Sequence, residues 1–168
     1  KEITLINGKK EIIIRNASDH ESFEALDGKT YILSKEMLVI ADQEKILALA
    51  GVIGGQHSKI TDSTTTIFLE SANFEPYSTR KTGQKLGLRT EAVQRFEKNL
   101  DPTLTEIALY RVMNVLQKLC PKAKMATEFM DVNHWTPKII QIPFDLKRLH
   151  SKIGKEIPRK TVTDILKS

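Results

Sequence analysis

Residues 51–102, GVIGGQHSKITDSTTTIFLESANFEPYSTRKTGQKLGLRTEAVQRFEKNLDP, contain the point where the sequence changes from strand-like to helix-like. The apolar run Ile67–Leu69 ends in Glu70. Farther along, Pro76 suits the first turn of a helix and Gly87 suits the left-handed residue that closes one. This stretch therefore predicts a strand that ends in a carboxylate and is followed by helices.

The sequence before Gly51 is dominated by strand signals. β-Branched and apolar runs bounded by polar residues are typical of strands. Within Phe23–Leu33, the pair Asp27-Gly28 predicts a hairpin with a type I′ turn, because this turn needs positive φ angles. The expected strands outside the hairpin are Glu11–Ala17, Leu38–Asp42, Ile46–Ile53 and Thr64–Phe74.

After residue 100 the pattern is mainly helical. Asp101-Pro102 combines an N-cap residue with a proline suited to the first turn, and apolar residues recur at helical spacing up to Cys120-Pro121. We expect this helix to pack on the sheet, with Cys120 as a buried structural thiol. A short strand is expected at Ile139–Pro143, followed by helices at Asp145–Ile153 and Pro158–Leu166.

These elements predict an α+β fold with a mixed, mostly antiparallel sheet and packed helices. We place this first domain at residues 1–136 and a linker at 136–140. Residues 140–168 would form the beginning of a small helical domain that is cut off before completion. Residues 138–168 contain eight basic and three acidic side chains, whereas residues 1–137 contain 18 of each, so the net charge of +5 lies in the second part. Both a polyanionic partner and a solvated lysine surface are compatible with this charge.

Composition excludes several classes of protein. One cysteine cannot form an internal disulfide and suits a reducing cytosol. The sequence contains no run of 18 apolar residues, and its first residues lack the apolar block of a signal peptide. We expect a soluble, cytoplasmic protein that does not interact with membranes.

Two features near the change of pattern are candidate binding elements. Gly51, Gly54 and Gly55 predict either a tight turn after a strand or a place where a ligand approaches the backbone closely. Glu70 ends an apolar run, and a bare buried carboxylate is costly. It is therefore expected either to form a salt bridge or to be a pocket carboxylate that accepts a ligand's hydrogen bond.

The helical part of the stretch is rich in cations. Arg80, Lys85 and Arg89 belong to a cluster that predicts either a solvated helix face or contacts to RNA phosphates. Thr90 suits the N-cap of a short helix, or it could present a hydroxyl that orients water or a ribose. No histidine, cysteine or carboxylate spacing indicates a metal site, and no serine has the setting of a nucleophile. We assign no catalytic residue.

Five motifs follow one another along the chain: LVIAD at Leu38–Asp42, ALAGVIGG at Ala48–Gly55, LESA at Leu69–Ala72, GLRTEA at Gly87–Ala92 and RFEKNLDP at Arg95–Pro102. Taken in this order, they resemble the bacterial phenylalanyl-tRNA synthetase β subunit. The similarity covers most of residues 10–120 and corresponds to the editing module, which hydrolyses mischarged tyrosyl-tRNA. Residues 140–168 resemble the start of the next domain of that subunit.

The resemblance implies a substrate-binding role for four residues. Gly54 matches a pocket glycine, and Glu70 matches the glutamate that recognises the phenolic hydroxyl of tyrosine. Thr90 and Ala92 match the threonine and alanine that line the pocket. The family also uses a histidine from a segment that would precede residue 1, so we expect this fragment alone to be inactive.

The resemblance also implies the context of the site. The parent enzyme ligates phenylalanine to tRNA(Phe) with ATP and Mg²⁺, although we expect no cofactor in this fragment. Two α and two β subunits form the family's heterotetramer, and ligation takes place in the α subunit. The alternative is that this part of the synthetase is a non-catalytic structural module that binds RNA or protein.

Overall fold

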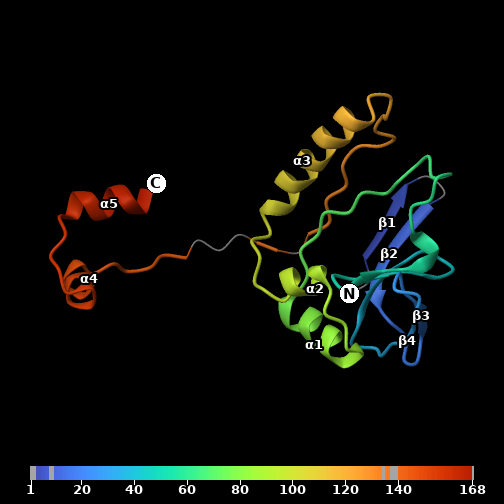
Figure 1. Cartoon of the computed structure of the whole chain (residues 1–168), viewed down its shortest axis with the longest axis horizontal. Coiled ribbons are helices and arrows are strands. Elements are labelled where there is room, and N and C mark those ends of the chain that lie inside the picture. Colours follow the sequence, from blue (N-terminus) through green and yellow to red (C-terminus); the bar gives the residue numbers. More distant parts are fainter. Residues whose placement is uncertain (1–2, 8–9, 134, 137–139, 168) are drawn as a thin grey trace. The chain divides into compact units, whose positions relative to one another are not determined.

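A computed structural model describes residues 3–7, 10–133, 135–136 and 140–167 of the chain (Figure 1). The chain divides into two compact units, Lys1–Asn133 (unit 1) and His134–Ser168 (unit 2). Among the described residues, the strands lie in unit 1 together with three α-helices, and unit 2 contributes two more α-helices. Every strand pair in the described residues is antiparallel, which confirms an α+β fold with a mostly antiparallel sheet.

Unit 1 is built on a five-stranded sheet in the order β1-β2-β5-β6-β7. Side chains alternate along β5, where Val39 and Ala41 are buried. The expected strands at 11–17, 38–42 and 46–53 are thus confirmed, although the third ends early because a turn follows Leu49. The strands are β1 Ile3–Asn7, β2 Lys10–Asn16, β5 Leu38–Ala41, β6 Ile46–Leu49 and β7 Ile53–Gly54.

The predicted hairpin is confirmed, but the predicted type of its turn is wrong. β3, Ser22–Glu24, pairs with β4, Thr30–Ile32, across a five-residue loop. Gly28 has a φ of 78°, whereas Asp27 does not have a positive φ. A type I′ turn needs positive φ at both central residues. Instead, Gly28 N donates to Ala25 O at 3.0 Å, so the loop is longer than the two-residue turn expected.

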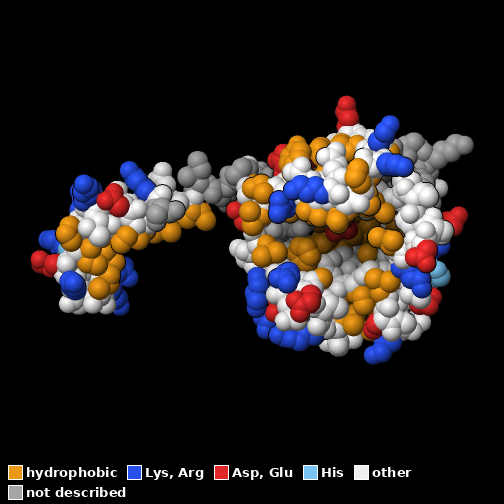
Figure 2. All heavy atoms as spheres, turned by 45° about the horizontal axis from the view of Figure 1, so that its top comes forward, with side chains coloured by type: hydrophobic (Ala, Val, Ile, Leu, Met, Phe, Trp, Pro, Cys, Tyr) orange, Lys and Arg blue, Asp and Glu red, His pale blue; other side chains and the backbone are white. Residues whose placement is uncertain are grey.

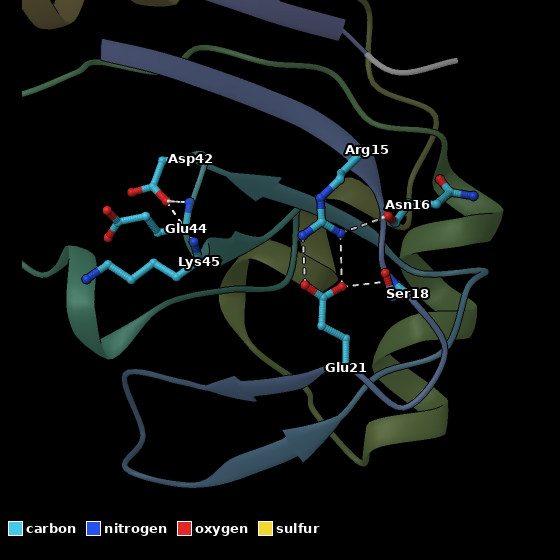
Figure 3. Close-up of polar contacts among 7 residues, drawn as sticks. All are labelled: Arg15, Asn16, Ser18, Glu21, Asp42, Glu44 and Lys45. Atoms are coloured by element: carbon cyan, nitrogen blue, oxygen red, sulfur yellow. Dashed lines mark hydrogen bonds and ion pairs between the residues drawn. The ribbon is translucent and has the colours of Figure 1, made fainter. Parts of the chain in front are cut away.

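A polar cluster fixes the chain where it leaves β2 (Figure 3). The guanidinium of Arg15 donates to both oxygens of Glu21, at 2.9 and 2.7 Å, and Ser18 N donates to Glu21 Oε2 at 2.7 Å. These contacts tie the end of β2 to the turn that leads into β3. The hydrogen bond from Arg15 is the main reason that the pKa of Glu21 is lowered.

The hydrophobic core joins the sheet, the hairpin and the first two helices. α1, Pro76–Leu86, and α2, Glu91–Phe96, lie together at one side of unit 1 (Figure 1). α2 contributes the buried Val93, and α1 and the following loop pack Leu86 and Leu88 against the core. The buried cluster comprises Ala17, Phe23, Ala25, Leu33, Met37, Val39, Ile46, Leu49, Val52 and Val93.

The predicted boundaries of α1 are confirmed. Pro76 is in the first turn, and Gly87 is a left-handed C-cap with a φ of 66°. The N-cap is Glu75, whose carboxylate accepts from Tyr77 N at 3.1 Å and from Ser78 N at 2.6 Å. Glutamate is an unusual N-cap residue, which is why sequence reasoning did not find it.

The strand predicted at Thr64–Phe74 is wrong. After η1, the short 3-10 helix Gln56–Ser58, the structure assigns no strand to residues 59–75. The β-branched run has the composition of a strand but finds no strand partner among the described residues. Ile67 and Phe68 are about half exposed as a result, at 48% and 51%.

The helix predicted after residue 101 is confirmed as α3, Leu104–Leu119, but the prediction of how it packs is wrong. Asp101 Oδ1 accepts from Thr103 N at 2.9 Å, so the helix begins slightly later than expected. No residue of α3 is buried, so the helix does not pack on the sheet as predicted. Cys120 is exposed, which contradicts the expected buried thiol.

Unit 2 contains α4, Leu146–Ile153, and α5, Arg159–Lys167. Asp145 Oδ1 accepts from Lys147 N at 2.9 Å, and Gly154 closes α4 with a φ of 74°, as the sequence predicts. Residues 140–143 form no strand, in contrast to the prediction, whereas residues 137–139 of that strand and of the linker lie outside the described residues.

Candidate functional site

Gly51 occupies a turn that needs glycine for two reasons. Its φ of 68° is in the left-handed region, and an added Cβ would lie 2.8 Å from the ring of Phe74. The turn is closed by Val52 N, which donates to Leu49 O at 3.0 Å. The tight-turn interpretation of this glycine therefore accounts for what the structure shows.

Gly54 lies in β7, three residues after Gly51, and is partly exposed. Its carbonyl accepts from Leu26 N at 3.0 Å, and a Cβ at residue 54 would lie 2.8 Å from Leu26 Cδ1. Leu26 is half exposed, so the end of its side chain could move aside. A side chain at residue 54 would thus compete for space with Leu26, a residue that sequence reasoning missed.

Glu70 lies in the segment without regular secondary structure between η1 and α1. Among the described residues, no hydrogen bond or ion pair reaches its carboxylate, so the expected salt bridge is absent there. Glu70 is an exposed residue, yet partial desolvation by the surrounding protein raises the pKa of its carboxyl above the usual range. Figure 2 shows a hollow in one face of unit 1, rimmed largely by hydrophobic side chains and with acidic atoms inside it.

The residues after Glu70 are anchored although they form no strand. Ser71 Oγ donates to Thr105 O at 2.7 Å, and Asn73 Nδ2 donates to Leu100 O at 3.1 Å. The ring of Phe74 contacts that of Phe96 edge-on at 5.1 Å between centroids. These contacts hold the backbone beside Glu70 in place without using its carboxylate.

Thr90 connects α2 to the turn at Gly51, which we call the glycine turn. Its hydroxyl accepts from Val93 N at 3.1 Å, which confirms it as the N-cap, and donates to Val52 O at 2.6 Å. A hydroxyl has one proton and two lone pairs. The proton is already used, so the hydroxyl can only accept a further hydrogen bond from a ligand. Ala92 follows in α2 and is partly exposed.

Gly54 and Thr90 lie on neighbouring pieces of chain, and Ala92 follows Thr90 in α2. The hydroxyl of Thr90 reaches the residue two before Gly54, and Phe74 packs between the glycine turn and α2. No hydrogen bond or ion pair joins the carboxylate of Glu70 to Gly54, Thr90 or Ala92 in the described part of the chain. Phe74 and Phe96 were missed because single aromatic residues in a short sequence do not reveal their partners.

The three cations predicted to bind RNA differ in their surroundings. Lys85 Nζ donates to Ser34 Oγ at 3.0 Å, and so it tethers α1 to the loop after β4. The guanidinium groups of Arg80 and Arg89 have no hydrogen bond or ion pair with any described residue. Both line a cavity of about 390 Å³ beside α1 and α2.

A second cavity, of about 280 Å³, lies beside the hairpin. His57 Nε2 is 3.3 Å from Glu24 Oε2, and both residues line this cavity together with Lys45. Neither cavity is lined by any of the four predicted pocket residues. Within the described ranges, no group of His, Cys, Asp or Glu side chains could hold a metal ion, so these residues do not offer a Mg²⁺ site.

The comparisons with known proteins agree with the order of the motifs. The model of the B3/4 domain matches residues 2–121, a span that contains Gly54, Glu70, Thr90 and Ala92. The chain belongs to the B3/4 domain family. No helix in the described part of this family member is long and apolar enough to cross a membrane.

Curated relatives share the similarity over almost the whole chain. The phenylalanine–tRNA ligase β subunit of Carboxydothermus hydrogenoformans is 43% identical over 160 residues, which is 94% of this chain and 20% of the relative. The subunit of the same name from Protochlamydia amoebophila is 39% identical over 166 residues, or 98% of this chain and 20% of the relative. This B3/4 chain thus spans about a fifth of the length of these relatives, and the resemblance to the β subunit is confirmed.

Proposed function

We propose that unit 1 forms part of an editing site in the β subunit of a phenylalanine–tRNA ligase, where it removes tyrosine from mischarged tRNA(Phe). The names of the relatives support the ligase, and the B3/4 match supports the module. The observation that carries the proposal is the carboxylate of Glu70, which has no hydrogen-bond or ion-pair partner among the described residues and whose pKa is raised by desolvation. In this proposal the β subunit acts with an α subunit and tRNA.

The proposed site distinguishes tyrosine from phenylalanine by one hydroxyl. A hydrophobic pocket rejects an added hydroxyl poorly, so the ligation site alone would admit tyrosine. Glu70 would accept the phenolic proton, whereas phenylalanine would leave the carboxylate desolvated and unpaired. An unsatisfied buried acceptor costs about 1–3 kcal/mol, and more when it is charged. Glu70 would therefore select the substrate that must be removed.

The hydrolysis itself needs no protein nucleophile. Water adds to the carbonyl carbon of the ester, the bond from that carbon to the ribose oxygen breaks, and the ribose oxygen takes up a proton. Tyrosine and the free tRNA are released. Holding the ester and the water in a productive geometry supplies much of the rate. Gly54, Thr90 and Ala92 would form the wall against which the amino acid lies.

The test is deacylation of tyrosyl-tRNA(Phe) by the full-length β subunit with its α partner. Glu70→Gln keeps the shape of the side chain but removes the charge, and we expect it to lower kcat/KM about tenfold to hundredfold for the tyrosyl ester. Glu44→Gln at the exposed tip between β5 and β6 is the matched control and should retain full activity. Unchanged tyrosine removal by Glu70→Gln would refute the role of Glu70. A wild-type complex that binds tRNA without deacylating it would instead favour the non-catalytic binding module.

A further inference from the structure

The cavity beside α1 and α2 has an excess of positive charge that the fold does not use. Lys98 Nζ lies 3.3 Å from Glu97 Oε1, so the acid in the cavity wall is already paired. The guanidinium groups of Arg80 and Arg89 remain without a partner among the described residues. The wall is formed by Arg80, Gly83, Gln84, Gly87, Leu88, Arg89, Val93, Glu97 and Lys98.

The cavity has a tightly packed floor. Gly83 is buried, and an added Cβ there would lie 2.9 Å from Leu88 O and 3.0 Å from Val93 Cγ1. Leu88 N donates to Gly83 O at 2.8 Å, which holds the loop after α1 against the helix. Arg80 and Arg89 are therefore presented from fixed backbone, one on α1 and one on the loop.

The loop that lines the cavity leads directly into the candidate editing site. Gly87, Leu88 and Arg89 contribute to the cavity wall, and the next residue, Thr90, hydrogen-bonds to Val52 in the glycine turn. A ligand that occupied both places would need an anionic group joined by a short link to the group held near Thr90. An aminoacylated RNA end has this chemistry, since the ester is on the terminal ribose and phosphates follow along the chain.

We propose that this cavity binds a backbone phosphate in the single-stranded acceptor end of a tRNA whose attached tyrosine is recognised by Glu70. This inference rests on the proposed editing function. Arginine suits the role because its planar fork of donors matches phosphate oxygens in a bidentate manner. The volume of about 390 Å³ is at the lower end of small-ligand sites, which fits one nucleotide better than a duplex. Figure 2 shows Lys and Arg side chains gathered on unit 1 near these helices.

The experiment compares two substrates of the full-length αβ complex that differ in phosphates. One is tyrosyl-tRNA(Phe), and the other is the tyrosine ester of adenosine, which has no phosphate. We expect the double variant Arg80→Gln/Arg89→Gln to lower kcat/KM for tyrosyl-tRNA about tenfold, while the adenosine ester is hydrolysed as by the wild type. The salt dependence of tRNA affinity should also weaken, by roughly 0.7 in the log–log slope for each lost phosphate contact.

Controls separate this role from folding and from the editing function itself. Arg80→Lys/Arg89→Lys keeps the charge and should recover part of the loss, and Arg111→Gln on α3 should have no effect. An equal loss on both substrates, or no loss on tyrosyl-tRNA, would overturn the phosphate site. If the wild type hydrolyses neither substrate, the editing proposal fails. In that case the phosphate site is tested by measuring the affinity of uncharged tRNA(Phe). If the double variant binds this tRNA as tightly as the wild type, the phosphate site is overturned.

Discussion

The backbone beside Glu70 and the carboxylate of Glu70 have different surroundings. The backbone next to it is anchored through Ser71 and Asn73, while the carboxylate has no partner among the described residues. Although Glu70 is exposed, partial desolvation raises the pKa of its carboxyl, so the charged form carries a free-energy cost in the folded chain that solvent screening keeps small. A residue retained at such a cost is typical of binding sites.

This cost predicts that Glu70→Gln stabilises the fold at neutral pH. The pKa of Glu70 is higher in the folded than in the unfolded state, so the carboxylate lowers stability increasingly as the pH rises through the folded pKa. We expect the variant to have a higher free energy of unfolding than the wild type at pH 7, and the difference to disappear below about pH 4. Denaturant unfolding at both pH values measures this.

The control for this experiment is Glu44→Gln, at the solvated tip between β5 and β6. It should leave the free energy of unfolding unchanged at both pH values. A Glu70→Gln variant that is less stable than the wild type at pH 7 would mean that the carboxylate has a stabilising partner. That result would contradict the picture of a carboxylate held ready for a ligand.

In the connection from β2 to β3, Glu21 is a carboxylate with partners, in contrast to Glu70. Glu21 accepts hydrogen bonds from both the Arg15 guanidinium and Ser18 N, and its pKa is lowered. The contacts are partly buried, with 26% and 22% of the two ion-pair side chains exposed, so they are screened less than surface pairs. This cluster holds the β3–β4 hairpin next to the sheet (Figure 3).

Glu21→Gln is therefore expected to destabilise the fold, with the opposite pH dependence to Glu70→Gln. Because the folded pKa lies below the unfolded one, the stabilisation is complete above the unfolded pKa and is lost as the pH falls through the folded pKa. We expect a loss of about 1–3 kcal/mol at pH 7 that shrinks below about pH 4. Urea unfolding of the variant and the wild type across this range measures it. A loss that is independent of pH would show that packing, and not charge, is responsible.

Local signals in the sequence were sufficient for some elements but not for their partners. The boundaries of α1 and α4 follow from Pro76, Gly87, Asp145 and Gly154, whose effects act within a few residues. The segment at Thr64–Phe74 has β-branched composition, but a strand also needs a neighbour, which composition does not supply. α3 likewise has helical periodicity without a buried face. Pairing and packing depend on residues far away in sequence, so these predictions were wrong.

In the candidate site, too, local features were predictable from the sequence and contacts between distant residues were not. The N-cap role of Thr90 depends on its own helix and was predictable, whereas its bond to Val52 joins residues 38 positions apart. The cavity around Arg80 and Arg89 was visible in the sequence only as a cluster of cations. Which cations are paired within the protein, as Lys85 is with Ser34, required the structure.

Buried residues are distributed very unevenly over the chain. Every member of the hydrophobic core cluster lies in unit 1, whereas Val162 is the buried hydrophobic residue found among the described residues of unit 2. A unit with so little buried surface gains little from folding against its conformational entropy. The two units are therefore expected to differ in the free energy of local opening.

Native-state hydrogen exchange of the 168-residue chain should reveal this difference. α1 has Thr79, Thr82 and Gly83 buried, while α5, a helix of similar length, buries only Val162. Amides protected by a packed core exchange through rare openings, whereas those of a poorly packed helix exchange through frequent local ones. We expect the amides of β5, β6 and α1 to be protected at least about a hundredfold more than those of α5, a difference of roughly 2.7 kcal/mol in opening free energy. Equal protection of α1 and α5 would show that unit 2 is stabilised by interactions other than the burial of Val162.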